Sequence, residues 1–425
     1  MRLNNMSSFK SFLRILGPGL LFASMAIGTS HLVLSTKAGA QYGWIMVIPI
    51  ILANILKYPF FEFGVRYTNI TNKTVIEGYL NRGRGYLWFY ALITIVTTFT
   101  ILAALYTVTA GLFINLFKVD FSVSETALGL FAFISLLLII GKYTFLEISL
   151  KFVVSILFIA LISTTVLVVY NGQITPEANF IPPTIFNEAG VLFLIGLMGW
   201  MPTTVEASSW VSLWSIEKFK NTSKPTLKQA LQEFNLGYIL TAVLAIFFLI
   251  IGWMTLYGSN TKISDSAVIF SDQLITLFTT NIGSWAYILI AIAAFSTMFS
   301  TCMTAHDAIS RVSVDIVELL ANQPKSKHKK YFFAIAVIVL AMINFIVVAA
   351  FKANMGKLVA LATFVSFVVA PIIGFLNYKN VTSNDIPMEY KPNKSLKILT
   401  FIGIIFLSLF SLYYFWIVLK QYIVI

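Results

Sequence analysis

Apolar residues in this chain form runs of about 20, separated by short polar segments. A helix of that length crosses the hydrocarbon core of a bilayer, which is about 30 Å thick. The pattern therefore predicts an all-α integral membrane protein with eleven transmembrane helices. We place these spans near residues 16–35, 42–63, 86–116, 124–141, 148–170, 190–213, 236–257, 284–306, 331–351, 357–377 and 396–419.

The composition agrees with this class and excludes a soluble protein. Hydrophobic residues make up 58% of the chain and charged residues only 11%, whereas about a quarter of a soluble domain is charged. The single cysteine, Cys302, allows no intramolecular disulfide and no cysteine cluster. Basic residues precede the first run without a small-residue cleavage site, so that run reads as a retained span.

The basic residues predict the topology. With a cytoplasmic N-terminus, 21 of the 29 lysines and arginines fall on the inner side and 6 on the outer side. Lys57 and Lys151 lie near predicted inner ends of spans, where their side chains can reach the surface. We therefore expect a plasma or inner membrane protein with its N-terminus inside and its C-terminus outside. The net charge of +12 is thus explained by the basic residues of the inner loops, and nucleic acid is not an expected partner.

Two of the spans contain helix-breaking sequence near their midpoints. The first carries Gly28-Thr29-Ser30-His31, and the sixth carries Gly199 followed by Pro202. Interrupted helices at matching places in two halves are typical of a transporter site at the bilayer midplane. We therefore predict an inverted repeat of five plus five spans, with one helix added. The expected units are a cytoplasmic tail (1–15), two repeats (16–170 and 190–377) and helix 11 (396–419).

A few polar residues at membrane depth are candidates for function. His31 could ligate a metal, accept a proton or bond a substrate, or it could bond carbonyls freed by the break. Thr203 and Glu206 have the spacing of a capping box, which would start a second half-helix; a substrate or proton role for Glu206 is the alternative. Met198 and Met201 flank the sixth-span break, and a thioether suits soft metals as well as apolar packing. No catalytic or phosphate-binding motif is present, so we expect neither an enzyme nor a cofactor.

Several stretches resemble the Nramp family of proton-coupled divalent-metal transporters, which have the LeuT-type fold. The segments LGPGLLFA, KAGAQYG, LANILKYPFFEFGVRY and TNKTVIEGY are similar to family motifs, and Met201-Pro202 stands where the family has Met-Pro-His. The likeness is strong over residues 15–80 and 196–218 and collinear elsewhere. It implies discontinuous first and sixth helices and a metal ion as substrate, with H⁺ as coupling ion.

The chain departs from the family where the metal is bound. Anchored on AGAQYG, the family's Asp-Pro-Gly-Asn motif becomes Gly28-Thr29-Ser30-His31, so Gly28 replaces the metal-binding aspartate and His31 the asparagine. The methionine ligand survives as Met201, the histidine after it becomes Thr203, and the alanine that offers a carbonyl aligns with Met198. Without the aspartate, neutral ligands must offset the desolvation of a divalent ion, which favours a softer ion bound by His31 and Met201.

The sequence thus predicts a secondary active transporter of the Nramp-like type that works by alternating access in a lipid bilayer. A divalent transition-metal ion is the first expectation. A small non-metal solute or anion is the alternative, because half-helix N-termini suit negative charge. A sensor or scaffold without transport is a third reading, and the oligomeric state is left open. The substrate residues we expect are Gly28, Thr29, Ser30, His31, Met198, Met201 and Thr203, with His31 and Met201 as metal ligands and Glu206 as coupling or capping residue.

Overall fold

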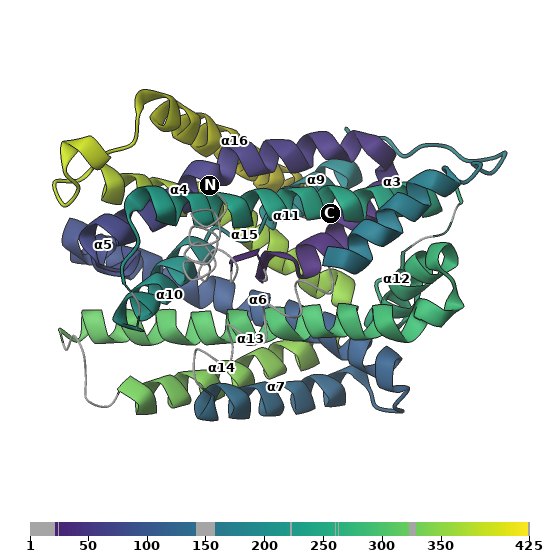
Figure 1. The fold of residues 1–425 in the computed structure, drawn as a ribbon, viewed down its shortest axis with the longest axis horizontal. Coiled ribbons are helices and arrows are strands. Elements are labelled where there is room, and N and C mark those ends of the chain that lie inside the picture. The colour runs from purple at the N-terminus through teal and green to yellow at the C-terminus, as the bar shows by residue number, and fades with distance from the viewer. Residues whose placement is uncertain are drawn as a thin grey trace, which may run out of the picture.

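The fold is helical throughout the part of the chain that the structure, a computed structural model, describes (Figure 1). That part is residues 22–141 except Ser24, 158–322 except Thr222, Asn260 and Lys262, and 329–423. Within it, eight helical segments are long and apolar enough to cross a membrane, and shorter apolar helices lie at Phe158–Asn171, Glu188–Gly199 and Ala267–Thr280. The expected all-α membrane fold is confirmed.

Each of the eleven predicted spans that falls on described residues corresponds to helix. The first bends and then continues through the π-helix η1 (Ser30–Ser35) into α3, and the sixth is split into α9 and α10. Only the second half of the fifth, Phe158–Asn171, lies within the described residues. The bounds are α3 (Thr36–Tyr42), α4 (Val47–Thr71), α6 (Arg84–Phe117), α7 (Val123–Ile140), α9 (Glu188–Gly199), α10 (Ala207–Asn221), α11 (Leu227–Leu256), α13 (Tyr287–Leu320), α14 (Lys329–Ala350), α15 (Met355–Thr382) and α16 (Lys394–Ile423).

Three further helices fall in predicted loops. Helix α5 (Val75–Arg82) begins at a capping box in which Thr74 and Glu77 bond each other's backbone amides. Helix α12 (Ala267–Ile282) packs on α6 and α13, and the 3₁₀ turn η4 (Met388–Tyr390) is the third. Two more 3₁₀ turns lie at the starts of predicted spans: η2 (Gly43–Met46) joins α3 to α4, and η3 (Ser284–Ala286) precedes α13. These helices are too short for a 20-residue apolar window, which is why hydropathy did not predict them.

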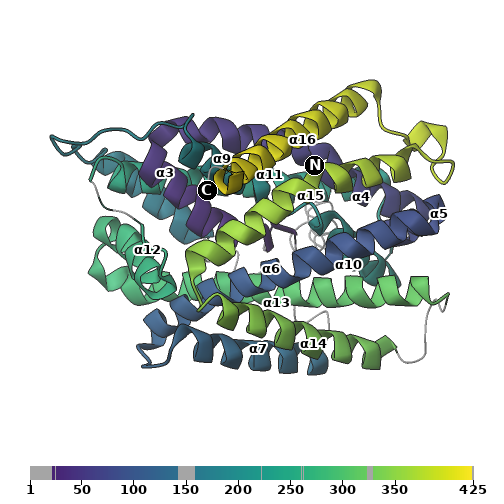
Figure 2. The same ribbon diagram turned by 180° about the vertical axis from the view of Figure 1, so that it is seen from behind.

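The contacts between helices are reciprocal: helices of the first half of the chain pack on those of the second half in matching pairs. Helices α6 and α13, from the third and eighth spans, lie against each other at the centre, and α7 and α14 form a layer beside them (Figures 1 and 2). On the other side, α3 of the first span packs on α11 of the seventh span. In the same way, α10 of the sixth span packs on α4 of the second span. This reciprocity supports the predicted inverted repeat, although its boundaries stay a prediction and the tail 1–15 lies outside the described residues.

Small residues allow the closest of these contacts. A Cβ atom at Gly39 of α3 would lie 2.0 Å from the Leu249 carbonyl oxygen, and one at Gly252 of α11 would lie 2.2 Å from the Thr36 carbonyl oxygen. The two glycines therefore let the backbones of α3 and α11 touch, which is how membrane helices gain packing energy without a hydrophobic driving force. This contact fixes the half-helix that follows the first break.

We predict that Gly252→Ala destabilises the protein. The added methyl group must push α3 away, and overpacking of this kind costs about 1–3 kcal/mol. The matched control is Gly129→Ala in α7, where the structure has no atom within 4 Å of the new methyl group. Thermal unfolding in detergent should show a lower melting temperature for Gly252→Ala alone; equal melting of both variants would contradict this packing.

Candidate functional site

The first helix breaks at Ile27 and Gly28. Both residues form a bend, and the amides of His31 and Leu32 both donate to the Gly28 carbonyl, at 3.1 and 3.0 Å, before the wider π-helix η1 begins. Gly28 also lies against α13: a Cβ atom there would be 2.7 Å from Cγ2 of Thr301. A side chain at position 28 would therefore require the Thr301 side chain to move.

The sixth helix breaks more completely. Helix α9 ends at Gly199 and α10 begins at Ala207, and residues 200–206 between them make no regular helix. The Met201–Pro202 peptide bond is cis. Gly199 packs tightly on α15, since a Cβ atom there would lie 2.2 Å from the Thr363 carbonyl oxygen. Both predicted discontinuities are confirmed.

The two breaks meet each other. The Ser30 hydroxyl lies 2.7 Å from the Ala26 carbonyl oxygen within the first break and 3.4 Å from the Pro202 carbonyl oxygen in the second. Between the breaks and helices α6 and α13 lies a cavity of about 30 Å³, which holds roughly one water-sized group. Its polar lining is Thr29, Ser30, Thr203, Thr204 and Thr301.

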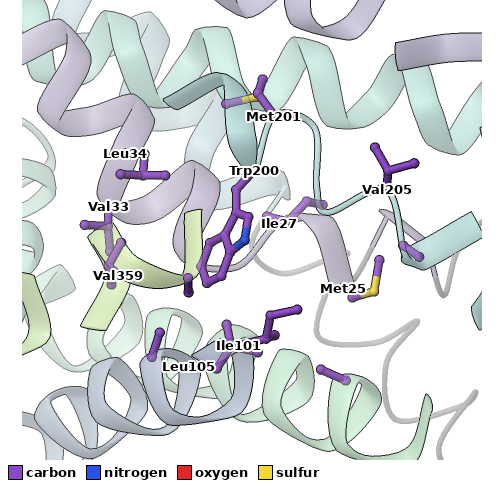
Figure 3. Close-up of a cluster of buried hydrophobic side chains, with 14 of the residues drawn as sticks. Met25, Ile27, Val33, Leu34, Ile101, Leu105, Trp200, Met201, Val205 and Val359 are labelled. Carbon is purple, nitrogen blue, oxygen red and sulfur yellow. The ribbon is translucent and has the colours of Figure 1, made fainter. Parts of the chain in front are cut away.

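The rest of the cavity wall is apolar. The Trp200 indole and the Met25 side chain line it together with Ile101 and Leu105 of α6 (Figure 3). Trp200 is held in place because its Nε1–H donates to the Ser366 hydroxyl of α15 at 2.9 Å. The wall therefore combines neutral hydroxyl groups, one thioether and an aromatic face.

The predicted site residues divide into two groups. Thr29, Ser30 and Thr203 line the cavity, and the Thr29 hydroxyl also donates to the Met298 sulfur at 3.8 Å. The other four, Gly28, His31, Met198 and Met201, are buried at the breaks but do not line the cavity.

Sequence reasoning missed several lining residues. Met25 lies one helical turn before the first break, and its position relative to Thr29 (i, i+4) could have revealed it. Thr301 lies among small residues next to Cys302, and no pattern in the sequence singles it out. The hydroxyl that faces the cavity from α13 could not be distinguished from its neighbours without the orientation of that helix.

His31 is fully buried and bonded at both ring nitrogens. Its Nε2 donates to the Thr241 carbonyl of α11 at 2.8 Å, and its Nδ1 lies 2.7 Å from the Ser30 hydroxyl. The imidazole thus joins the first break to α11. In this conformation both of its nitrogens are already engaged by protein groups, so a metal ion would have to displace one of them.

Glu206 lies at the end of the second break and is 3% exposed. The Thr204 hydroxyl donates to its Oε2, while its Oε1 has no hydrogen-bond partner among the described residues. The predicted capping box of Thr203 and Glu206 is not formed, because α10 begins at Ala207 and the first bonds after the break are of the tighter i to i+3 kind, starting with the Ala207 amide to the Thr204 carbonyl. The carboxyl group is therefore available for another role.

Lys57 was expected to reach the membrane surface, and the structure corrects this. The residue lies near the middle of α4 with its side chain 0% exposed. Its ammonium group is 2.5 Å from the Met198 carbonyl oxygen and 2.7 Å from that of Gly199. The side chain thus contacts the last carbonyls of α9.

No group of three or more His, Cys, Asp or Glu residues comes together as a metal site within the described ranges. Oxygen-rich carboxylate cages of the kind that bind Ca²⁺ are therefore not built in that part of the chain. An ion in the cavity would instead meet hydroxyl oxygens and the thioether, with the Glu206 carboxyl group near the same break.

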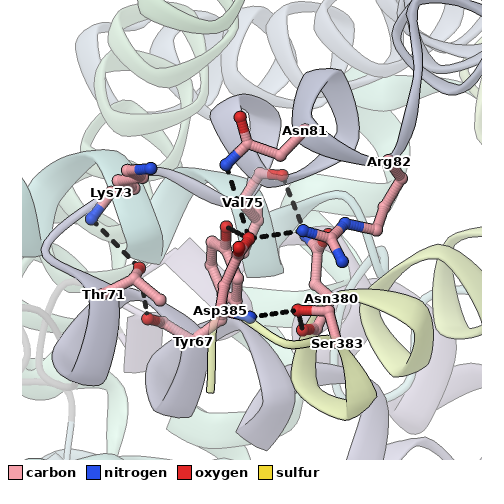
Figure 4. A network of polar contacts seen from close by, with 9 residues as sticks. All are labelled: Tyr67, Thr71, Lys73, Val75, Asn81, Arg82, Asn380, Ser383 and Asp385. Carbon is pink, nitrogen blue, oxygen red and sulfur yellow. Dashed lines mark hydrogen bonds and ion pairs between the residues drawn. The ribbon is translucent and has the colours of Figure 1, made fainter. Parts of the chain in front are cut away.

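The two ends of the molecule are tied by polar contacts outside the site. At the end predicted to be cytoplasmic, Arg82 of α5 pairs with Asp385 at 2.5 Å, and the Tyr67 hydroxyl and the Asn81 amide donate to the same carboxylate (Figure 4). Partial burial alone would raise the pKa of Asp385, but the bond from Tyr67 and the charge of Arg82 lower it below its ordinary value. At the other end, Lys37 pairs with Asp265 at 2.8 Å.

Two broken helices that meet at a buried cavity within a bundle of membrane-spanning helices define a membrane transporter of the LeuT type. Comparison with solved structures agrees on the fold. The Eremococcus coleocola manganese transporter (crystal structure of a mutant) matches with a TM-score of 0.70 and 14% identity, covering 95% of this chain and 86% of that one. Mhp1, a nucleobase-cation-symport-1 family transporter in a closed conformation, matches with a TM-score of 0.57 and 13% identity, covering 96% and 93%.

The family follows from the sequence comparison. The model of the natural resistance-associated macrophage protein-like (Nramp) family matches residues 19–417. An uncharacterized protein of Pasteurella multocida (strain Pm70) is 33% identical over 408 residues, which is 96% of this chain and 93% of that protein. This chain therefore belongs to the Nramp family.

We predict that Asp385→Asn lowers the melting temperature by a few degrees at neutral pH. A carboxyl group whose pKa is lowered by folding adds stability above its ordinary pKa, about 3.9, and loses this contribution as the pH falls through the folded value. The difference from the unmodified protein should therefore shrink below about pH 4. Asp120→Asn, at an exposed loop position, is the control, and a difference that does not change with pH would contradict the assignment.

Proposed function

We propose that this protein is a secondary active transporter that moves a divalent transition-metal ion across the membrane by alternating access. The observation that carries the proposal is the small cavity, lined by buried residues, at the meeting point of the two helix breaks. Family membership and the likeness in fold to a protein named as a manganese transporter support it. The cavity residues Thr29, Ser30 and Thr203 would contact the ion.

The size of the cavity favours an ion over a larger solute. About 30 Å³ admits roughly one ion-sized group, and organic solutes need several times that volume. The available donors are hydroxyl oxygens and the Met25 thioether, a mixture that suits a softer ion better than a hard hydrated one. The Glu206 carboxyl group, with one unpartnered oxygen, would supply negative charge close to the site.

The contacts at both ends of the molecule fit an occluded step of such a cycle. With the N-terminus inside, as the basic residues predict, the Arg82–Asp385 pair closes the cytoplasmic end and the Lys37–Asp265 pair closes the outer end. Alternating access would then break one tie at a time while the site between the two breaks stays fixed. Proton coupling would use a buried titratable group, for which Glu206 is the candidate.

A second candidate function is transport of a small anion. The observation that favours it is the buried Lys57, because a fixed positive charge next to the sixth-helix break attracts anions and repels cations. The cavity itself is lined by neutral hydroxyl groups. The two candidates differ in the sign of the charge that is carried, so one assay separates them.

Purified protein in liposomes tests the proposal. Uptake of Mn, Fe, Co, Ni, Zn or Cd ions, measured with a metal-sensitive dye inside the vesicles, is the expected result. Absence of uptake for all six ions, together with uptake of an anion such as formate or nitrate, would reject the metal ion in favour of the second candidate. Empty liposomes control for leakage.

We predict that Met25→Leu lowers Cd²⁺ uptake more than Mn²⁺ uptake. Leucine keeps the volume of the side chain but removes the sulfur, which is the soft donor in the cavity wall. The loss for Cd²⁺ should be on the order of tenfold in apparent affinity, which corresponds to about 1.4 kcal/mol. The matched control is Met342→Leu on the exposed face of α14. Equal losses for both ions would exclude a sulfur ligand at residue 25.

We predict that His31→Ala abolishes uptake, whereas Lys329→Ala at the start of α14 does not. His31→Gln separates two reasons for the loss. If the imidazole acts by bonding the Thr241 carbonyl, the glutamine N–H retains much of the transport; if it ligates the metal, glutamine and alanine lose it alike. Wild-type uptake in His31→Ala would remove this residue from the site altogether.

A further inference from the structure

The last carbonyl groups of α9 lack their regular helical donors. In a continuous helix the Met198 carbonyl would accept from the residue four positions later, but that residue is Pro202, which has no N–H, and the carbonyl instead accepts a long backbone bond of 3.4 Å from the Met201 amide. The Gly199 carbonyl would accept from Thr203, which lies in the break. These carbonyls also form the negative end of the α9 dipole. Inside a membrane such groups require a partner, and a cation is the best one.

The Lys57 ammonium group is that partner. It is fully buried and contacts both carbonyl oxygens, at 2.5 and 2.7 Å. Carbonyl oxygens at the C-terminal end of a half-helix are the ligands with which broken-helix transporters bind a small cation. In this chain a side chain from α4 occupies the place of that cation.

The other charged groups on the helices packed around Lys57 lie away from it. On α4 the nearest is Glu62, which pairs with Arg66. The remaining charged residues of the packed helices, as far as they are described, are confined to the helix ends. These are Glu77 and Arg82 of α5, Glu188 of α9, Glu217, Lys218 and Lys220 of α10, Lys228 and Glu233 of α11, Lys357 and Lys379 of α15, and Lys394, Lys397 and Lys420 of α16.

We propose that Lys57 is a tethered cation that permanently fills an ion-binding site at the end of α9, formed by the carbonyls of Met198 and Gly199. The chain thereby needs no free cation at this place to hold the broken sixth helix. Lys57 is a positioning residue, and its removal exposes a site for a monovalent cation, either an alkali ion or a small primary ammonium ion. This inference does not depend on which solute is transported.

The test is a gain of cation dependence in Lys57→Ala. We compare thermal unfolding of the purified protein in choline, sodium, potassium and methylammonium chloride at one ionic strength, without any transport substrate. Lys57→Ala should melt several degrees lower than the unmodified protein in choline, and sodium or methylammonium should restore this loss with a saturable concentration dependence. The unmodified protein should melt alike in all four salts.

Two further variants sharpen the result. Lys57→Met fills the same space without charge, so it should be destabilised without any response to the cation, and Lys220→Ala on the exposed end of α10 should behave like the unmodified protein. Identical melting of Lys57→Ala in all salts would overturn the proposal, and so would an equal response of Lys57→Met.

If Lys57→Ala aggregates in choline, size-exclusion chromatography in each salt replaces the melting experiment. A monodisperse peak in methylammonium supports the proposal, and aggregation in every salt contradicts it. Because this experiment contains no metal substrate, its outcome is separate from that of the uptake assay.

Discussion

Backbone polar groups that a broken helix frees inside a bilayer must find partners within the protein, since hydrocarbon offers none. The rest of this structure depends on how that constraint is met. At the first break the Ser30 hydroxyl bonds the Ala26 carbonyl and reaches toward Pro202. At the second break, the ammonium group of Lys57, a residue of α4, donates hydrogen bonds to the last two carbonyls of α9. Because Ser30 also contacts the second break and Lys57 comes from α4, the two breaks and the helices around them form a single unit.

The breaks themselves could be predicted from the sequence, because Gly28 and Pro202 interrupt apolar runs by local backbone chemistry. Their partners could not, because a partner is set by how distant helices pack. Lys57 shows why: the apolar run near 42–63 places it close to a span end, but α4 begins at Val47 and continues to Thr71, so the residue falls near the helix middle. Hydropathy shows which residues can cross a bilayer, but it does not show where the helix ends, because a helix can continue into polar residues beyond the apolar run.

The two breaks differ in the polar groups that surround them. At the first, Gly28 lies so close to Thr301 that a Cβ atom there would be 2.7 Å from the Thr301 Cγ2, so a larger residue would require Thr301 to move. The cavity wall at this place consists of neutral hydroxyl groups, those of Thr29 and Thr301 among them. The buried ionisable side chains lie at the second break, where Glu206 follows Pro202 and Lys57 contacts the carbonyls of α9. Burying such groups in a membrane is costly unless they have polar partners, as Lys57 has in the two carbonyls.

The ties at the two ends of the molecule are unequal, and this bears on how the site would open. Asp385 is partly shielded and receives bonds from Tyr67 and Arg82, so three elements must separate to release it. At the opposite end the side chain of Asp265 is 67% exposed and that of Lys37 is 12% exposed. An ion pair with one partner in water contributes about 0–1 kcal/mol, because solvent screens it and competes for both groups. Opening toward the Lys37 end therefore meets the smaller polar barrier, and the close contact of α3 with α11 becomes the main resistance on that side.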